Sequence, residues 1–321
     1  MANTGDQPWQ RVPIDPQSVD APLSRAAVFL VVTVNDTPEA LATVKDVLGG
    51  ITDQVKTVGF RDLGARLSCN VGIGAALWPR LTDTPLPREL HPFREIAGSV
   101  HTAISTPGDL LFHIRAERSD FTFELERQLL DSLAGAVEVV DEVVGFRYFD
   151  ARDLLGFVDG TANPAGGDMT EATVVGDEDP EHAGGSYVVV QKYLHDLGAW
   201  NRLPVPSQEG VIGRTKVENI ELDDAEHGQK SHKTLATIVD EAGVEHDILR
   251  DNMPFGRPGH GEFGTYFIGY SRALWVIERM LERMFVGDPE GSYDRILDFS
   301  TAATGSTFFA PTRSFLESLG S

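Results

Sequence analysis

The amino-acid sequence predicts an α+β protein made of two units of similar plan, each an antiparallel sheet with helices on one face. The main observation is that residues 109–133 and residues 264–285 each read as a strand followed by a helix. In addition, the apolar runs AAVFLVVTV (26–34) and GSYVVVQKYL (185–194) open the two halves of the chain and are typical of strands. The two halves share almost no sequence identity, so they repeat a plan and not a sequence.

Each strand–helix segment is defined by its apolar pattern. In DLLFHIRAERSDFTFELERQLLDSL the compact apolar run at 110–116 predicts a strand, and in GTYFIGYSRALWVIERMLERMF the β-branched and aromatic run at 265–270 does the same. Apolar residues then recur at helical spacing in both segments, so we expect a helix to follow each strand. In the first segment they are Phe121, Leu125, Leu129 and Leu133, and in the second they are Leu274, Ile277, Leu281 and Met284 or Phe285.

Between the two units lies a region rich in glycine and acidic residues, from 156 to 185, where the apolar periodicity lapses. The sequence therefore predicts an N-terminal domain at 1–155, a connecting segment at 156–185 and a C-terminal domain at 186–321. The stretch DLLGFVDGTANPAGG (153–167) falls at this junction and places the carboxylate of Asp159 between glycines and a proline. Read alone, it is ordinary turn chemistry. Its position matters because binding sites often form at domain junctions.

The composition excludes several classes of function. The 321 residues include 27 Lys and Arg against 49 Asp and Glu, a net charge of −22, which would repel a nucleic-acid backbone. No apolar run approaches the roughly 20 residues of a membrane span. The polar start MANTGDQPWQRVPIDPQSVD shows no secretory signal, so we expect a cytoplasmic protein that binds no membrane. The single cysteine, Cys69, excludes an internal disulfide, a Cys-ligated iron–sulfur cluster and a c-type haem attachment, and in LSCNVGIG it reads as a small buried apolar residue.

Three further stretches combine charges with glycine, proline or aromatic residues: KSHKT (230–234), DILRDNMPFG (247–256) and SYDRILDFSTAATG (292–305). Together with GFVDGTANP (156–164), they resemble the dye-decolourising peroxidases, and the bacterial B-type branch in particular. The similarity extends over nearly the whole chain, and GFVDGT combined with the Arg-x-Asn stretch is specific. The resemblance implies two ferredoxin-like domains of the dimeric α+β barrel superfamily and a haem b (iron protoporphyrin IX) cofactor. It also implies a peroxidase that reduces hydrogen peroxide and oxidises phenols, dyes or similar small organic donors through ferryl intermediates.

On one side of the haem, the resemblance implies that His232 is the proximal iron ligand and that Asp294 bonds its second ring nitrogen. A carboxylate in that place fixes the imidazole tautomer and increases electron density at the iron, which favours cleavage of the O–O bond. Taken without the motif, one of nine histidines is more often a surface or core group than a ligand. Arg214, in VIGRTK, matches a family position near the haem propionates, where a planar cation suits carboxylates. A plain surface arginine is the alternative.

On the other side, the family pattern places Asp159, Arg250 and Asn252. Peroxide must lose a proton from the oxygen that binds iron and regain one on the oxygen that leaves, and Asp159 can accept and then donate that proton. Arg250 would stabilise charge on the leaving oxygen, and Asn252 would position peroxide or water. Because the reference pKa of aspartate is about 3.9, we expect better activity at mildly acidic pH than a histidine base would give. Read alone, residues 250–252 are a solvated, charged loop.

The chain departs from the family pattern at two places. B-type relatives commonly read Gly-Thr-Glu-Asn-Pro where this chain has Ala162, so an acidic group near the haem edge is missing. No efficient Mn(II) site is expected, although Glu221 and Glu245 could still supply oxygen ligands. Relatives housed in protein nanocompartments often carry a Gly/Ser/Leu-type tail, whereas this chain stops at FLESLGS, which argues against cargo targeting. Relatives are frequently oligomeric, so a homo-oligomer is expected.

Two other functions remain open from the sequence. A haem-handling protein of the same fold would bind haem with little turnover. A haem-free, metal-dependent hydrolase would use Asp159, Asp251 and His232 as ligands. If bulky donors are oxidised, electrons would pass through aromatic residues, although each candidate is more often a core residue. The candidates are Trp200, Trp275, Tyr193 and Tyr266.

Overall fold

Within the residues that the structure describes, a ten-stranded antiparallel sheet runs through both halves of the chain, and the two halves have the same strand order. The computed structural model describes residues 16–224 and 228–320. The order is β2-β5-β1-β6 in the first half and β10-β12-β7-β14 in the second. If the four strands of each half are numbered along the chain, they lie side by side in the order second, third, first, fourth in both halves. The strands of the first half are β1 (Ala26–Val34), β2 (Ser68–Ile73), β5 (Leu110–Ala116) and β6 (Val137–Phe146). Those of the second half are β7 (Ser186–His195), β10 (Leu249–Arg250), β12 (Glu262–Ser271) and β14 (Ser306–Ala310).

The two halves join where β14 pairs with β2, through Phe309 and Ile73. Two more strands complete the sheet: β11 (Met253–Arg257) pairs with β12, and β13 (Ser300–Ala302) pairs with β7. Two separate two-stranded ribbons lie outside it. They are β3 (Ile96–Ala97) with β4 (Thr102–Ala103), and β8 (Ile238–Val239) with β9 (Glu245–His246).

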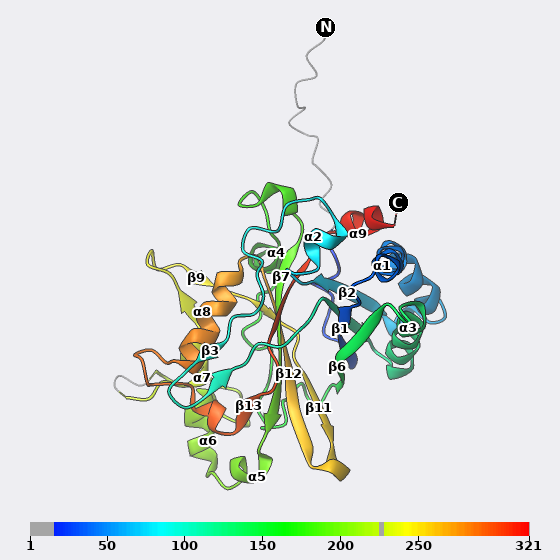
Figure 1. The fold of residues 1–321 in the computed structure, drawn as a ribbon. Helices are drawn as coiled ribbons and strands as arrows, with labels where there is room; N and C mark the ends of the chain where they lie inside the picture. The colour runs from blue at the N-terminus through cyan, green and yellow to red at the C-terminus, as the bar shows by residue number, and fades with distance from the viewer. Residues whose placement is uncertain (1–15, 225–227, 321) are drawn as a thin grey trace.

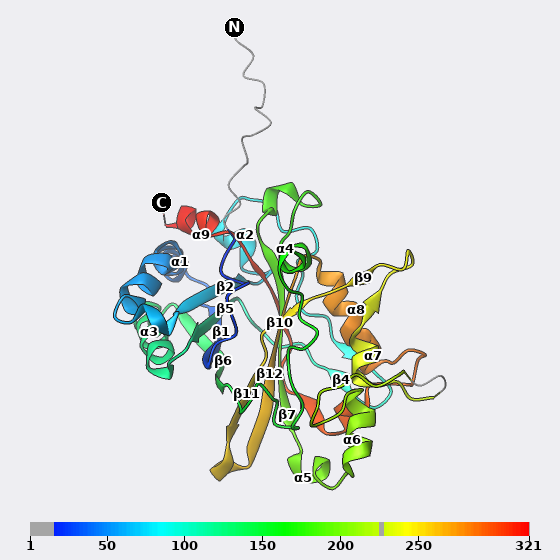
Figure 2. The same ribbon diagram turned by 180° about the vertical axis from the view of Figure 1, so that it is seen from behind.

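The longer helices lie on the two flanks of the sheet (Figure 1, Figure 2). α1 (Pro38–Gly59) and α3 (Ser119–Ser132) pack against the first half, whereas α8 (Leu274–Phe285) packs against the second, with α7 (His232–Ala236) beside it. α9 (Arg313–Leu319) lies against α1. The remaining helical segments are short. They are α2 (Trp78–Leu81), α4 (Gly167–Thr173), α5 (Leu197–Trp200), α6 (Val205–Ile212) and the 3-10 turns η1 (Leu63–Ala65), η2 (Pro180–His182), η3 (Pro258–His260) and η4 (Arg295–Asp298).

Local sequence explains where these helices begin and which face they bury. Thr37 caps α1, because its side chain accepts a hydrogen bond from the backbone N–H of Ala40, and Pro38 occupies the first turn, where no N–H is needed. In α8 the apolar positions recur at helical spacing, and that face is buried against the sheet. The predicted positions Leu274, Ile277, Leu281, Met284 and Phe285 are all buried.

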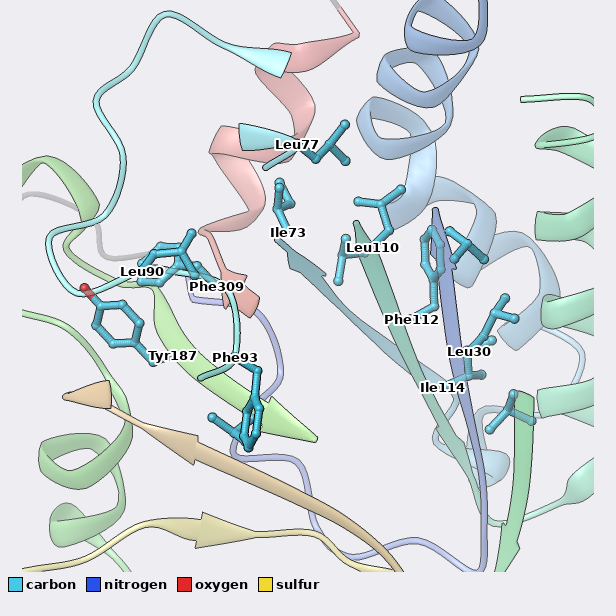
Figure 3. Packing of buried hydrophobic residues seen from close by; sticks show 14 of the residues in the cluster. Leu30, Ile73, Leu77, Leu90, Phe93, Leu110, Phe112, Ile114, Tyr187 and Phe309 are labelled. Atoms are coloured by element: carbon cyan, nitrogen blue, oxygen red, sulfur yellow. The ribbon is translucent and has the colours of Figure 1, made fainter. Parts of the chain in front are cut away.

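Strand β1 is buried on both faces, which explains its uninterrupted apolar sequence. One face, with Val28, Leu30 and Val32, belongs to a cluster that lies under the helices and extends into the second half (Figure 3). The other face, with Phe29 and Val31, belongs to an inner cluster shared with the second half. The members from the second half include Val188, Val190, Tyr266, Ile268 and Phe308. The inner faces of the two halves therefore form one core.

The predicted α+β architecture with a repeated plan is confirmed. The strands expected at 26–34 and 110–116 coincide with β1 and β5. The helix expected after the second of these is α3, in which Phe121, Leu125 and Leu129 are buried. The segment between β6 and β7 contains only the short helix α4 and the turn η2, in line with its lapse of periodicity.

Three further expectations concern Cys69, membranes and the N-terminus. Cys69 lies in β2 and packs against the core as a small apolar residue, and burial raises the pKa of its thiol to about 12. In the described part of the chain, no helix has the length and apolar character needed to cross a membrane. Residues 1–15, which make up most of the stretch read for a secretory signal, lie outside the described residues.

Candidate active site

His232 is held by a buried carboxylate at the start of α7. It is the first residue of the helix, after the N-cap Ser231, and its ring Nδ1 lies 2.6 Å from Oδ2 of Asp294. Asp294 is fully buried, and its other oxygen accepts a hydrogen bond from the N–H of Ile296 at 3.0 Å. Burial lowers the pKa of His232, but the charge and hydrogen bond of Asp294 outweigh it and raise the pKa above its usual value. Since Nδ1 bonds Asp294, Nε2 is the ring nitrogen left for a ligand.

A large cavity, called here the central cavity, opens beside His232 between the connecting segment, β7, β12 and α8. The empty space within it is about 1280 Å³, counting the part open to solvent. The wall is mainly apolar, with charged groups at a few points. Apolar wall residues include Leu155, Phe157, Ile212, Phe267, Leu281 and Met284. A mainly apolar wall that includes an imidazole suits a mostly apolar group that takes a nitrogen ligand, and haem b has these properties.

Asp159 and Asn252 both line the central cavity, and backbone groups fix their orientation. Oδ1 of Asp159 accepts a hydrogen bond from the N–H of Gly160 at 2.7 Å and lies 3.5 Å from Nδ2 of Asn252. The Asn252 amide is oriented by its oxygen, which accepts a hydrogen bond from the N–H of Ile268 at 3.1 Å. No described residue donates to Oδ2 of Asp159. That oxygen is therefore available to a molecule in the cavity.

Arg250 also lines the central cavity, and its backbone is bound by a residue of the GTANP sequence. Nδ2 of Asn163 donates to the carbonyl oxygen of Arg250 at 2.7 Å, and Oδ1 of Asn163 accepts from its N–H at 3.0 Å. The guanidinium Nε is buried and hydrogen-bonds to no group of the described residues. Burial lowers the pKa of Arg250, while the charges of Asp159 and Asp247 act in the opposite direction. The side chain stays cationic, because an arginine is not deprotonated in proteins.

Arg214, expected near the haem propionates, lies where the central cavity meets a polar outer cavity. Its guanidinium donates to Oε2 of Glu221 at 2.8 Å and to the carbonyl oxygen of Asn219 at 3.1 Å. Lys233 donates to the other oxygen of Glu221 at 2.9 Å. Two cations at the cavity edge thus share one carboxylate. The outer cavity is lined by Ala162, Glu221, Asp224, Glu245, Arg279 and Arg283, among others.

The sequence does not predict two further polar side chains of the central cavity, Asp153 and His195. Oδ1 of Asp153 accepts a hydrogen bond from the N–H of Phe157 at 2.9 Å, and burial raises the pKa of this carboxyl to about 7. His195 bonds the hydroxyls of Ser300 at 2.8 Å and Thr265 at 2.9 Å, and burial lowers its pKa to about 4, so the ring is neutral. Asp153 stands in the motif stretch, where it could have been noticed, whereas no sequence pattern marks His195.

Asp251 lies between Arg250 and Asn252 but does not belong to the wall of the central cavity. Its Oδ2 accepts a hydrogen bond from Nη1 of Arg115 at 2.8 Å, and the residue is 1% exposed. The described residues contain no cluster of three or more His, Cys, Asp or Glu side chains suited to a metal ion. The hydrolase alternative, with Asp159, Asp251 and His232 as ligands of one metal, is therefore wrong.

The four aromatic residues considered for electron transfer lie in different surroundings. Among them, only Tyr193 lines the central cavity, where its hydroxyl donates to Gln191 at 2.8 Å. Trp200 and Tyr266 are fully buried. Trp275 is 39% exposed, so of these four it is the one that a bulky donor can contact.

A haem peroxidase needs an imidazole that can bind the iron and, near it, a group that transfers protons. The wall of the central cavity offers His232 for the first task and Asp159 for the second. The fold and the site thus define the class as haem peroxidase. Comparison with known proteins gives the family: models described as "Dyp-type peroxidase, N-terminal" and "Dyp-type peroxidase, C-terminal" match residues 16–147 and 150–315. The chain belongs to the Dyp-type peroxidase family and is an enzyme, a peroxidase.

Similar proteins agree in name and in shape. The chain is 57% identical over 305 residues to a dye-decolorizing peroxidase of Mycolicibacterium paratuberculosis, and this match covers 95% of this chain and 86% of the relative. Among solved structures, DyPB from Rhodococcus jostii superimposes with a TM-score of 0.93 at 58% identity, covering 97% of this chain and 100% of that chain. The encapsulated DyP-type peroxidase from Mycobacterium smegmatis gives a TM-score of 0.92 at 57% identity, covering 95% of this chain and 98% of that chain. Variants of the Rhodococcus jostii protein have been solved in complex with heme, and one in complex with manganese.

Proposed function

We propose that this peroxidase binds haem b, that Nε2 of His232 would hold its iron, and that the enzyme reduces hydrogen peroxide while oxidising phenols, dyes or similar small organic donors. The observation that carries the proposal is the bond between His232 and Asp294 at the wall of a largely apolar cavity that Asp159 also lines. The complex of a 58%-identical relative with heme supports the choice of cofactor. When bound, the haem iron supplies the redox chemistry that cleaves the O–O bond.

The proton-transfer atom is Oδ2 of Asp159, which accepts the first proton of peroxide and returns it to the leaving oxygen. Oδ1 is already engaged by the N–H of Gly160 and faces Nδ2 of Asn252, and these contacts hold the plane of the carboxylate. Asn252 is held in turn by the N–H of Ile268, so its Nδ2 hydrogens are directed toward Asp159 and the cavity. A carboxylate held in one orientation transfers a proton without first rearranging.

The cationic groups have two tasks. Arg250 stabilises the negative charge that develops on the leaving oxygen, which is supported by its place in the wall of the same cavity as Asp159. Arg214 and Lys233, which lie together at the cavity edge, would hold the haem propionates, since guanidinium and ammonium groups suit carboxylates. On the other side, Asp294 keeps the proton of His232 on Nδ1, so that Nε2 presents its lone pair.

The haem-handling alternative needs no oriented acid–base group. The hydrogen bonds that orient Asp159 and Asn252 therefore favour turnover of peroxide over storage of haem. These hydrogen bonds do not identify the organic donor. The central cavity is partly open to solvent, which favours donors small enough to enter it.

The proposal has three finer parts. The first is the division into domains at 1–155 and 186–321 with a connecting segment at 156–185; the two family matches also divide the chain in two, between residues 147 and 150, and the C-terminal match includes that segment. The second is a homo-oligomer that works in the cytoplasm. The third concerns a nanocompartment partner: the Mycobacterium smegmatis relative is described as encapsulated, which leaves encapsulation of this enzyme open.

The cofactor part of the proposal is tested by the absorption spectrum of protein produced with adequate haem. The parent is expected to keep its haem band through dialysis, and His232→Ala to lose it. His260→Ala is the matched control, because His260 is exposed at the turn before β12 and should behave as the parent. A parent that is colourless under these conditions would contradict the proposal.

The catalytic part is tested by rapid mixing with stoichiometric peroxide. The haem band of the parent should shift within seconds, whereas a haem carrier would bleach slowly. We expect Asp159→Asn to slow the shift by roughly 10²–10⁴-fold, and Arg250→Leu by roughly 10²–10³-fold. The assignment fails if both variants react as fast as the parent.

A further inference from the structure

We infer that the buried ion pair between Arg115 and Asp251 holds the segment of Arg250 and Asn252 so that both side chains face the central cavity. The inference rests on the proposed function, in which Arg250 and Asn252 act on peroxide. Within the described chain, every wall residue of the central cavity is Asp153 or a later residue. Arg115 belongs to β5 of the first half. The first half would thus contribute to the reaction through Arg115, a positioning residue that touches neither substrate nor cofactor.

The backbone around Asp251 needs such support. β10 ends at Arg250 and β11 begins at Met253, so the regular pairing with β12 is interrupted at the residues between them. At this break, the N–H of Asp251 bonds the carbonyl oxygen of Ile268 at 3.2 Å. The register against β12 is the same on both sides of this gap, and side-chain contacts add to it in holding the direction in which each residue projects.

Asp251 projects away from the central cavity into the interface between the two halves, where it is 1% exposed. There its Oδ2 accepts a hydrogen bond from Nη1 of Arg115 at 2.8 Å, and Nη2 of Arg115 donates to the carbonyl oxygen of Ser18. Side chains of consecutive residues in extended chain point to opposite sides. Fixing Asp251 toward the interface therefore directs its neighbours Arg250 and Asn252 toward the cavity.

Three contacts thus act on three consecutive residues. Asn163 bonds the backbone of Arg250, Arg115 bonds the side chain of Asp251, and the N–H of Ile268 bonds the amide oxygen of Asn252. Of the three contacts, the one from Arg115 comes from the other half of the sheet. The pair therefore also ties the placement of the site residues to the docking of the two halves.

Stability alone does not account for this pair. It lies in a buried polar cluster with Asn70, His113 and Tyr270, in which several side-chain atoms hydrogen-bond to no group of the described residues. These atoms are Asn70 Oδ1, His113 Nε2, Arg115 Nε and Asp251 Oδ1. Buried unsatisfied polar atoms are destabilising, and a well-packed apolar pair is often as stable as a buried ion pair or more so. An apolar pair, however, would not fix the direction of Asp251.

The experiment replaces the pair by apolar residues, Arg115→Met with Asp251→Leu, in the haem-loaded full chain. The matched control is Lys192→Met with Asp141→Leu, because Lys192 and Asp141 form another ion pair between the two halves, at 3.1 Å, outside the site. Three quantities are measured: the unfolding midpoint, the rate of the haem-band shift with peroxide, and hydrogen exchange at the N–H groups of Asp251 and Ile268.

We expect the apolar Arg115/Asp251 variant to unfold within about 3 °C of the parent and to react with peroxide roughly 10–100-fold more slowly. Exchange at Asp251 and Ile268 should become roughly tenfold faster. The control should change neither the peroxide rate nor exchange at these two positions. Parent-like rates and exchange in the apolar variant would overturn the inference. If that variant does not fold, Asp251→Asn decides by the same rate and exchange measurements, with smaller changes of the same sign expected.

Failure of the inference and failure of the proposed function give different results. If the proposed function is wrong, Asp159→Asn and Arg250→Leu react as fast as the parent, whatever Arg115 does. If only the inference is wrong, those two variants are slow, while the Arg115/Asp251 variant has the peroxide rate and exchange of the parent.

Discussion

The side chain of Asn163 forms with the backbone of Arg250 the two hydrogen bonds that a neighbouring strand would form. It donates to the carbonyl oxygen at 2.7 Å and accepts from the N–H at 3.0 Å, although the two residues are 87 positions apart in the chain. Asn163 follows Asp159 in the connecting segment, and Arg250 ends β10. One amide therefore sets the carboxylate loop and the guanidinium strand at a fixed separation.

We expect Asn163→Ala to lower both stability and the rate of reaction with peroxide. Two backbone groups of Arg250 would lose their partners, at a cost of roughly 2–3 kcal/mol in the free energy of unfolding, and the displaced guanidinium would slow the reaction about tenfold or more. Haem retention should be unchanged, because His232 is untouched. Urea unfolding and stopped-flow absorbance measure the two effects, with the exposed Asn201→Ala as control. A parent-like peroxide rate would show that these bonds do not position Arg250.

The rate of the parent is expected to fall as the pH rises through about 7, because of Asp153. Burial raises the pKa of Asp153 to about 7, and the nearby charge of Asp159 acts in the same direction, so Asp153 is neutral in mildly acidic solution and charged above that pH. A second negative charge beside Asp159 raises the energy of negative charge developing on peroxide. Asp153→Asn should therefore keep its rate at about pH 8, while the exposed Asp168→Asn should follow the parent. Stopped-flow rates from about pH 4 to 8 decide, and a parent rate that rises over this range contradicts the prediction.

The same carboxyl affects stability, with a definite sign. Its folded pKa of about 7 exceeds the unfolded value of 3.8, so between these values the folded chain holds a proton that the unfolded chain has released. Stability therefore falls as pH rises through this window. Asp153→Asn should be more stable than the parent at about pH 8 and equal to it at about pH 3.5, as measured by urea unfolding.

How far the sequence predicts the fold depends on burial. β1 and β5 are predictable because both faces of each strand are covered, which leaves a continuous apolar run. β6 gives no such signal: it is the last strand in the order, most of its side chains are exposed, and acidic residues such as Glu138 and Glu142 interrupt its valines. It is a strand because it pairs with β1 along its length. Pairing between distant segments is tertiary information that no local pattern carries.

For the site, the sequence predicts residue types better than contacts. The structure brings the residues suggested by the resemblance to one cavity or directly behind it: His232, Asp294, Asp159, Arg250, Asn252 and Arg214. It also gives Arg214 a partner, Glu221, that the sequence does not indicate. The bond of Asn163 to Arg250 and the direction of Asp251 depend on register between segments 87 and 136 positions apart. No motif reports such a register, and for this reason Asp251 could be taken for a metal ligand.

A glutamate at position 162 is expected to create a Mn(II) site. Ala162, Glu221 and Glu245 line the same outer cavity, and Mn(II) prefers carboxylate oxygens. In the parent, Glu221 is bound by Arg214 and Lys233, so we expect weak Mn(II) binding. Ala162→Glu should tighten binding about tenfold by adding a ligand, as measured by electron paramagnetic resonance of free Mn(II).

Two controls accompany the Mn(II) measurement. Ala165→Glu adds the same charge three residues further along the chain and should leave the affinity near that of the parent. Adding Glu245→Gln to Ala162→Glu should reverse most of the gain. Equal tightening by Ala162→Glu and Ala165→Glu would mean that overall charge, and not a ligand set, attracts the ion.

The stability of the first half should depend on the protonation of Glu126 in α3. This residue is 6% exposed, its Oε1 hydrogen-bonds to no described group, and burial together with the charge of Glu142 raises its pKa from 4.5 to about 7. Between those values the folded chain holds a proton that the unfolded chain has lost, so stability falls as pH rises. Glu126→Gln should gain roughly 1–2 kcal/mol over the parent at about pH 8 and nothing at about pH 4. Urea unfolding at both pH values measures this, with the exposed Glu138→Gln as control. A gain of equal size at both pH values would show that the charge of Glu126 is not its cause.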